Sequence, residues 1–155
     1  MDNRFMQLAV ESAQEGIRNE HGGPFGACIV RNGEVLSVAH NTVLIDCDPT
    51  CHAELNAIRK ACKKLGTHIL EGCVLYTTAE PCPMCLAGTY WARISKIVIG
   101  VTRECAGHYG FDDAAFYDEL EAPITERSVE TVFSVMSEDC EKVFKEWKER
   151  NGVVY

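Results

Sequence analysis

Residues 52–85 of the chain read HAELNAIRKACKKLGTHILEGCVLYTTAEPCPMC, and this stretch decides the fold class. Apolar side chains recur at helical spacing from His52 onward, which predicts a helix that ends before Gly66, a residue typical of helix C-caps. The apolar run 73–78 predicts a buried strand, and the proline-containing turn after it leads into a second helix over about 84–92. Alternating helices and strands of this length are typical of an α/β protein.

The flanking segments extend this pattern in both directions. The first of them predicts an amphipathic helix, and the turn signal Asn32-Gly33 joins the next two strands into a hairpin. The expected elements outside the quoted stretch are helices over 2–18, 114–120 and 138–150 and strands over 25–30, 35–40, 96–101 and 132–136. We therefore predict a three-layer α/β/α sandwich whose central mixed sheet has five strands, with helices on both faces.

Length and composition are those of one globular domain. The 155 residues are 46% hydrophobic and 25% charged, which is ordinary for a folded protein and unlike a disordered one. We find no repeat and no linker, so we predict a single domain over 1–155 with a short tail at 151–155.

The start of the chain and its cysteines bear on location. No apolar run approaches the roughly 18–20 residues of a membrane helix, and the first residues lack the basic-then-apolar pattern of a signal peptide. The chain has nine cysteines, an odd number that cannot pair completely within one chain. We expect a cytoplasmic protein with no membrane partner, in which thiols stay reduced.

Charge is distributed unevenly. The formal charge is −8 from 15 basic and 23 acidic side chains. Residues 1–103 hold ten of each sign, whereas residues 104–155 hold thirteen acidic and five basic side chains and carry the whole −8. Because an acidic surface repels phosphates, nucleic acid is not expected as a partner.

Two helix starts carry the residues that point to chemistry. His52-Ala53-Glu54 begins one helix, and Pro81-Cys82-Pro83-Met84-Cys85 begins the next. Helices that follow strands of one sheet place their N-termini at the same edge, so the two sets could converge. His52, Cys82 and Cys85 would then bind one zinc ion per chain and leave a fourth position for water.

Glu54 has a specific place in this scheme. It lies two residues after the histidine ligand, where its carboxylate could accept a proton from water and later deliver it to a leaving amine. The pair His-x-Glu and Pro-Cys-x-x-Cys matches the signature of zinc-dependent base deaminases.

Other interpretations of the same residues stay open. Cys82-x-x-Cys85 alone could be a redox dithiol or two core thiols, and Cys28 or Cys51 could complete a closed structural zinc site, although Cys51 is awkwardly adjacent to His52. The chain could then be a zinc-stabilised binding module without catalysis. Glu54 weighs against that, because a structural site needs no carboxylate there.

Further segments of the chain, beyond the zinc motifs, match one known family. They are Gly22 to Ala27, Asp48-Pro49-Thr50, Asn56 to Arg59, Tyr90 to Arg93, Gly110-Phe111-Asp112-Asp113 and Tyr155. With these segments the chain resembles the cytidine deaminase superfamily, and most closely its bacterial guanine-deaminase branch. The resemblance implies hydrolytic deamination of guanine to xanthine and ammonia, with Glu54 as the proton shuttle.

The resemblance also implies roles at the substrate. Asn41, Phe25, Ala53 and Tyr155 would bind the base, and Asp113 would be a second catalytic carboxylate. Asn41 could instead be a turn residue, Phe25 a core residue, and Asp113 a helix N-cap. Tyr155 would act as a lid, although a terminal tyrosine is often disordered.

Substrate and assembly follow from the same resemblance. A related aminated ring, such as guanosine, cytosine or an aminotriazine, and the adenosine of a tRNA are alternatives to guanine. The segment 105–109 departs from the family pattern and leaves the exact substrate open. We also expect a homodimer that exchanges its C-terminal segments.

Overall fold

The computed structural model describes residues 3–155, whose contacts divide into a first unit up to Ala114 and a second unit from Ala115 to Tyr155. The first unit holds the sheet, with strands β1 (Gly26–Arg31), β2 (Glu34–His40), β3 (Cys73–Ala79) and β4 (Lys96–Val101). Their order is β2-β1-β3-β4. β1 is antiparallel to both neighbours, and β3 is parallel to β4. The sheet is therefore mixed, as the sequence predicts.

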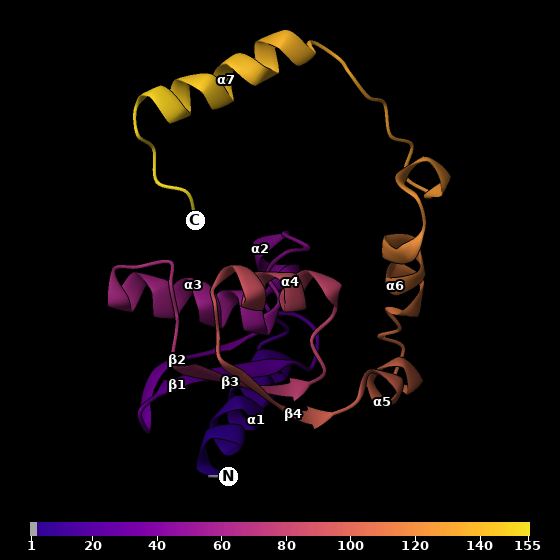
Figure 1. Cartoon of the computed structure of the whole chain (residues 1–155). Coiled ribbons are helices and arrows are strands. Elements are labelled where there is room, and N and C mark those ends of the chain that lie inside the picture. The colour runs from indigo at the N-terminus through magenta and orange to yellow at the C-terminus, as the bar shows by residue number, and fades with distance from the viewer. Residues whose placement is uncertain (1–2) are drawn as a thin grey trace. The chain divides into compact units, whose positions relative to one another are not determined.

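Helices cover both faces of this sheet (Figure 1). α1 (Asn3–Arg18) packs on one face, and α3 (Ala53–Leu65) packs on the other beside α4 (Pro83–Trp91). Two shorter helices, α2 (Val43–Asp46) and α5 (Arg103–His108), lie in segments for which the sequence predicts none. The three-layer α/β/α arrangement is confirmed.

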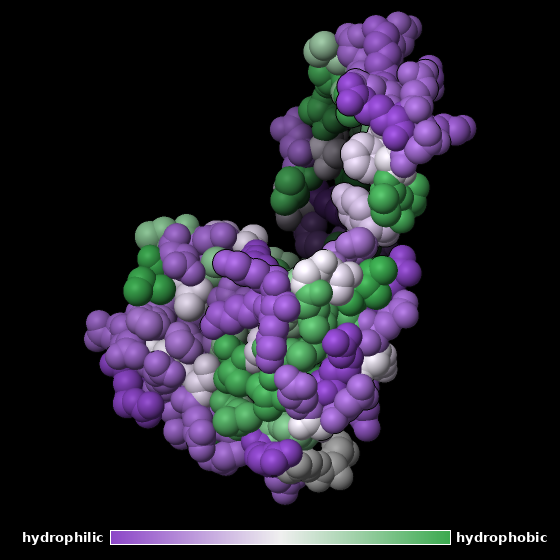
Figure 2. All heavy atoms as spheres, turned by 90° about the vertical axis from the view of Figure 1, so that its left-hand side faces the viewer, coloured by the Kyte–Doolittle hydropathy of each residue, from purple (hydrophilic) through white to green (hydrophobic). Residues whose placement is uncertain are grey.

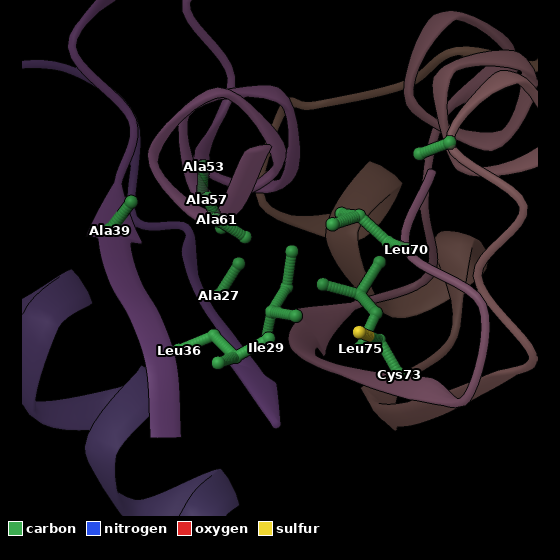
Figure 3. Packing of buried hydrophobic residues seen from close by; sticks show 11 residues of the cluster. Ala27, Ile29, Leu36, Ala39, Ala53, Ala57, Ala61, Leu70, Cys73 and Leu75 are labelled. Atoms are coloured by element: carbon green, nitrogen blue, oxygen red, sulfur yellow. The ribbon is translucent and has the colours of Figure 1, made fainter. Parts of the chain in front are cut away.

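Alternating side chains of the strands build a separate core on each face. Ala27 and Ile29 of β1 point toward α3, whose Ala57 and Ala61 approach them one turn apart (Figure 3). Cys28 lies between them in sequence and packs toward α1 in the other cluster. Small alanines let α3 lie close to the sheet, which brings its N-terminus to the sheet edge where the functional residues lie.

The second unit is helical and has no strand in the described chain. It contains α6 (Ala114–Glu121, which begins one residue before the unit), the 3₁₀ turn η1 (Ile124–Glu126) and α7 (Ser137–Glu149). The predicted fifth strand over 132–136 is wrong: the sheet has four strands. An apolar run becomes a strand only beside another strand, and this segment has none within the described chain.

One face of the molecule is mostly polar (Figure 2), and the cysteines are reduced. The face of the molecule in Figure 2 is largely hydrophilic, with an apolar area among the charged side chains. None of the helices formed by residues 3–155 has the length and apolarity needed to cross a membrane. All nine cysteines lie in this part of the chain and are free thiols.

Candidate active site and metal centre

Three potential metal ligands meet where α3 and α4 begin. His52 is the N-cap of α3 and Cys82 is the N-cap of α4, with Cys85 one turn further along. Nδ1 of His52 lies 3.5 Å from the sulfur of Cys82 and 3.5 Å from that of Cys85. Tetrahedral zinc with ordinary Zn–S and Zn–N bonds would separate these atoms by about 3.6 Å. The donor set and its spacing therefore fit zinc.

Close packing of the two helices makes this convergence possible. A Cβ added to Gly88 on α4 would lie 2.5 Å from Cδ2 of Leu55 on α3. A larger residue at position 88 would force the Leu55 side chain to move out of this contact.

Without a metal ion, the two thiols have opposite protonation preferences, and only Cys82 is favoured as a thiolate. A hydrogen bond with Cys85 holds the pKa of Cys82 well below its usual range, despite burial. The same interaction, together with burial and the charge of Glu54, raises the pKa of the Cys85 thiol. Hydrogen bonding to Cys82 raises the pKa of His52. A divalent cation would favour both thiolates and a neutral imidazole at once.

Glu54 lies against this ligand cluster and is 5% exposed. The Cys85 thiol approaches Oε2 at 3.6 Å, and the Thr77 hydroxyl approaches Oε1 at 3.3 Å. Burial, followed by the negative charge of Cys82, raises the pKa of Glu54. A carboxyl group in this environment can hold a proton and release it, which general acid–base catalysis requires.

Asn41 is 4% exposed, at the end of β2, and its orientation is fixed. Its Oδ1 accepts hydrogen bonds from the N–H groups of Gly23 and Val43, each at 3.1 Å. A flipped amide would place NH₂ against two N–H donors. Asn41 therefore serves the turn, as one interpretation expects, and offers a substrate only its Nδ2 donor rather than a donor and an acceptor.

Phe25 is half-buried and is paired with Phe111, whose segment carries the resemblance but for which no individual role was predicted. The ring of Phe111 stands edge-on to it, with centroids 4.9 Å apart. This contact joins the loop before β1 to the segment after α5. A T-shaped pair fixes the plane of Phe25, which a stacked base would require.

Asp113 lies within electrostatic reach of the ligand cluster. Burial, followed by the charge of Cys82, raises the pKa of this carboxyl group. The neighbouring Asp112 accepts the hydrogen bond from the N–H of Ala114 at 3.0 Å. The hydrogen bond at the start of α6 therefore uses Asp112, and the role of Asp113 at the substrate stays a prediction.

Ala53 and Tyr155 are the two other residues that are expected to bind the substrate. Ala53 is fully buried, and its side chain belongs to the core between α3 and the sheet (Figure 3). Only its backbone is left for a substrate. Tyr155 belongs to the second unit, so its role as a lid stays a prediction.

Neither of the alternative thiols joins the cluster. Among the described residues, the group of closely spaced ligand atoms contains only His52, Cys82 and Cys85. Cys28 packs on the opposite face of the sheet, and Cys51 lies beside Arg59. The described chain therefore provides three ligands, which is typical of a catalytic rather than a structural zinc site.

Two further contacts were missed by sequence reasoning. Thr77 is 1% exposed on β3 and reaches Glu54, and its signal was a polar residue at a core-facing strand position. Glu80 accepts a hydrogen bond from the N–H of Arg103 at 3.0 Å, which ties the start of α5 to the loop that carries Cys82.

Comparison with known proteins agrees with this geometry. Residues 1–101 match the model of the family described as the cytidine and deoxycytidylate deaminase zinc-binding region. The chain is 46% identical over 125 residues to guanine deaminase of Bacillus subtilis (strain 168), which covers 81% of this chain and 80% of that protein. It is 34% identical over 151 residues to the tRNA-specific adenosine deaminase of Aquifex aeolicus (strain VF5), which covers 97% of each.

A solved structure extends the similarity to the whole chain. The X-ray structure of guanine deaminase from Bacillus subtilis superposes with a TM-score of 0.90 and 41% identity, covering 100% of this chain and 98% of that one. The chain therefore belongs to the cytidine and deoxycytidylate deaminase family and is a hydrolytic zinc deaminase.

Proposed function

We propose that the protein converts guanine and water into xanthine and ammonia. The observation that carries this proposal is the similarity to guanine deaminase over the full chain, together with Asp113 beside the ligand cluster. The roles of the residues below belong to the same proposal.

The reaction replaces the amino group on C2 of guanine by oxygen. The C2–O bond forms and the C2–N bond to the amino group breaks. Of the two protons of water, one leaves with ammonia and the other stays on ring nitrogen N3. When bound by His52, Cys82 and Cys85, zinc supplies a Lewis acid that lowers the pKa of water.

Glu54 moves the protons in this scheme. Burial raises the pKa of its carboxyl group, which favours the form that carries the proton. It accepts a proton from water as base and returns it as acid to the substrate. Asp113, whose pKa burial also raises, provides the second proton transfer.

Asn41 and Phe25 hold the base. The Nδ2 group of Asn41 donates to an acceptor on the purine edge, and the Phe25 ring, fixed by Phe111, stacks on its face. Tyr155 closes over the base as a lid.

A tRNA adenosine deaminase is the second candidate, because the Aquifex aeolicus relative matches 97% of the chain. The acidic residues 104–155 oppose it, since an RNA substrate needs a basic surface for its phosphates.

We also propose a cytoplasmic, single-domain chain that forms a homodimer by exchanging C-terminal segments. Nine free thiols suit a reducing compartment. β4 is an edge strand with exposed Ile99 and Val101, and segment 132–136 is apolar without a strand partner in the described chain. In a dimer, segment 132–136 of one copy could pair with the β4 edge of the other copy, which would give both a strand partner.

The test is an ammonia-release assay over guanine, guanosine, cytosine, adenine and a tRNA anticodon hairpin. Turnover of guanine alone is the expected result. Deamination of the hairpin, or no release from guanine, contradicts the proposal.

A further inference from the structure

Two histidines outside the metal centre touch each other where the loop after α1 meets the end of β2. Nδ1 of His21 lies 2.9 Å from Nε2 of His40, and the rings stack with centroids 5.1 Å apart. The other ring nitrogen of His40 lies 3.2 Å from the hydroxyl of Ser12 on α1. We call Ser12, His40 and His21 the histidine row.

The fold makes room for this row. A Cβ added to Gly16 of α1 would lie 2.8 Å from Cδ2 of the His40 ring. Ser12, at the other end of the row, is only 9% exposed. The His40 ring is therefore fitted between α1 and His21.

The row sits at the base of the loop that carries the proposed substrate-binding groups. The carbonyl of His21 accepts hydrogen bonds from the N–H groups of Leu44 and Ile45, both at 3.1 Å. Asn41 directly follows His40, donates from its backbone to the carbonyl of Phe25 at 3.0 Å, and accepts from Gly23. A shift at the row would move the turn that orients Asn41.

The number of protons on the two imidazole rings decides whether the hydrogen bond between His21 and His40 can form. With both rings neutral, one N–H lies between His21 and His40, and the Ser12 hydroxyl fits either tautomer. One added proton is tolerated, because a charged ring can donate at both nitrogens. Two added protons place two N–H groups against each other, and the contact must break.

Burial and the charge of His21 favour the neutral form of His40. Burial, followed by the charge of His21, lowers the pKa of His40. Glu15 on α1 opposes this and Lys60 on α3 adds to it, while β1 presents uncharged Gly26 opposite His40. The unfolded chain takes up this proton at about pH 6.5. The stability that neutral His40 contributes to the fold is therefore complete above that pH. It is lost as the pH falls through the lowered pKa of His40.

We propose that the histidine row is a positioning device that fastens the loop 19–25 to β2, sets Asn41 and Phe25 for the base, and releases the loop when both rings are protonated. Its effect on guanine rests on the function proposed above, whereas its effect on the loop does not.

The test compares wild type with His21→Gln, His21→Leu and the control His68→Gln, a histidine beyond the far end of α3. Gln can accept from Nε2 of His40 without taking up a proton, and Leu cannot. Hydrogen-exchange protection factors of the Gly23 and Val43 amides report the loop at pH 8 and pH 6. Zinc content and the KM and kcat for guanine are measured in parallel.

We expect wild type and His68→Gln to lose protection about three- to fourfold between pH 8 and pH 6, with a matching rise in KM relative to His21→Gln. His21→Gln keeps protection at both pH values, and His21→Leu is low at both, with kcat and zinc unchanged. Acid loss of protection in His21→Gln, or wild-type protection in His21→Leu, overturns the proposal. If His21→Leu does not fold, the comparison of His21→Gln with wild type decides. Absence of guanine turnover in wild type rejects the proposed function alone.

Discussion

At the scale of single residues, the catalytic role proposed for Glu54 comes with a cost to stability. Its raised pKa means that the folded chain binds the proton more tightly than the unfolded chain. This stabilises the fold below the unfolded pKa of about 4.3, and the benefit is lost as pH rises through the folded pKa. At neutral pH the buried charge is therefore unfavourable.

Replacement Glu54→Gln separates the two roles. We expect kcat for guanine to fall by about 10²–10⁴-fold, because the proton shuttle is removed. Zinc content should stay at one per chain, and the Tm of the metal-free protein at pH 8 should be higher than that of metal-free wild type. Activity assays, metal analysis and calorimetry check this, and retained turnover would remove Glu54 from the mechanism.

Asn41 allows a similar separation of scaffold from substrate contact. In Asn41→Asp the carboxylate still accepts from Gly23 and Val43, so the turn and the Tm should be kept, but the Nδ2 donor is lost. We expect KM for guanine to rise about 10- to 100-fold. The control Asn41→Ala should lose stability as well. An unchanged KM in Asn41→Asp would make Asn41 a turn residue only.

Thr77 is the positioning partner of Glu54. Its hydroxyl proton has two acceptors, Oε1 of Glu54 at 3.3 Å and the carbonyl of Ala79 at 2.9 Å. Thr77→Val keeps the shape but removes the hydroxyl, so kcat should fall about tenfold with KM unchanged. Thr77→Ser should restore kcat. Equal rates for Val and Ser would show that the hydroxyl does not matter.

At the scale of elements, regular segments could be predicted and tertiary contacts could not. The spacing of apolar side chains and the turn residues between them correctly predicted α3 and β3. Gly66 ends α3 in the left-handed conformation at φ 66°. α5 was missed because its six residues are too few to show a helical period of apolar side chains. The strand at 132–136 was wrong because strand formation depends on a neighbour that local sequence cannot supply.

The same distinction applies to the candidate site. The sequence predicted which residues meet at the metal centre, because their spacing at two helix starts is a local pattern. These residues are His52, Cys82, Cys85 and Glu54. Phe111, Thr77 and the histidine row were not predicted, because each pairs residues distant in sequence whose contact exists only after packing. The fixed amide of Asn41 likewise depends on Gly23, eighteen positions earlier.

Zinc should act as a clamp between the N-termini of α3 and α4. Its removal by a chelator should lower the free energy of unfolding by about 4 kcal/mol at free zinc of a thousand times Kd, or roughly 8–16 °C in Tm. Two further thiols should become reactive. Cys82→Ser should lose zinc, whereas the exposed control Cys47→Ser should keep it. An unchanged Tm after chelation would mean that zinc does not join the helices.

At the scale of the whole molecule, the uneven charge separates the two candidate substrates. Guanine is neutral, so its KM should change less than about twofold between 50 and 200 mM salt. Binding of an RNA hairpin would weaken by orders of magnitude over the same range. A steep salt dependence of turnover would favour RNA over the free base.

The exchanged dimer can be tested by complementation between two defective chains. Glu54→Gln lacks the proton shuttle but keeps its tail, and a chain without Tyr155 lacks the proposed lid but keeps Glu54. If the tail serves the partner's site, a mixed dimer contains one site with both groups. Random pairing after joint refolding makes half of the dimers mixed, so activity should return to about a quarter of wild type. If each tail serves its own chain, every site keeps one defect, and mixing should restore nothing. Sedimentation of both variants as dimers is the control.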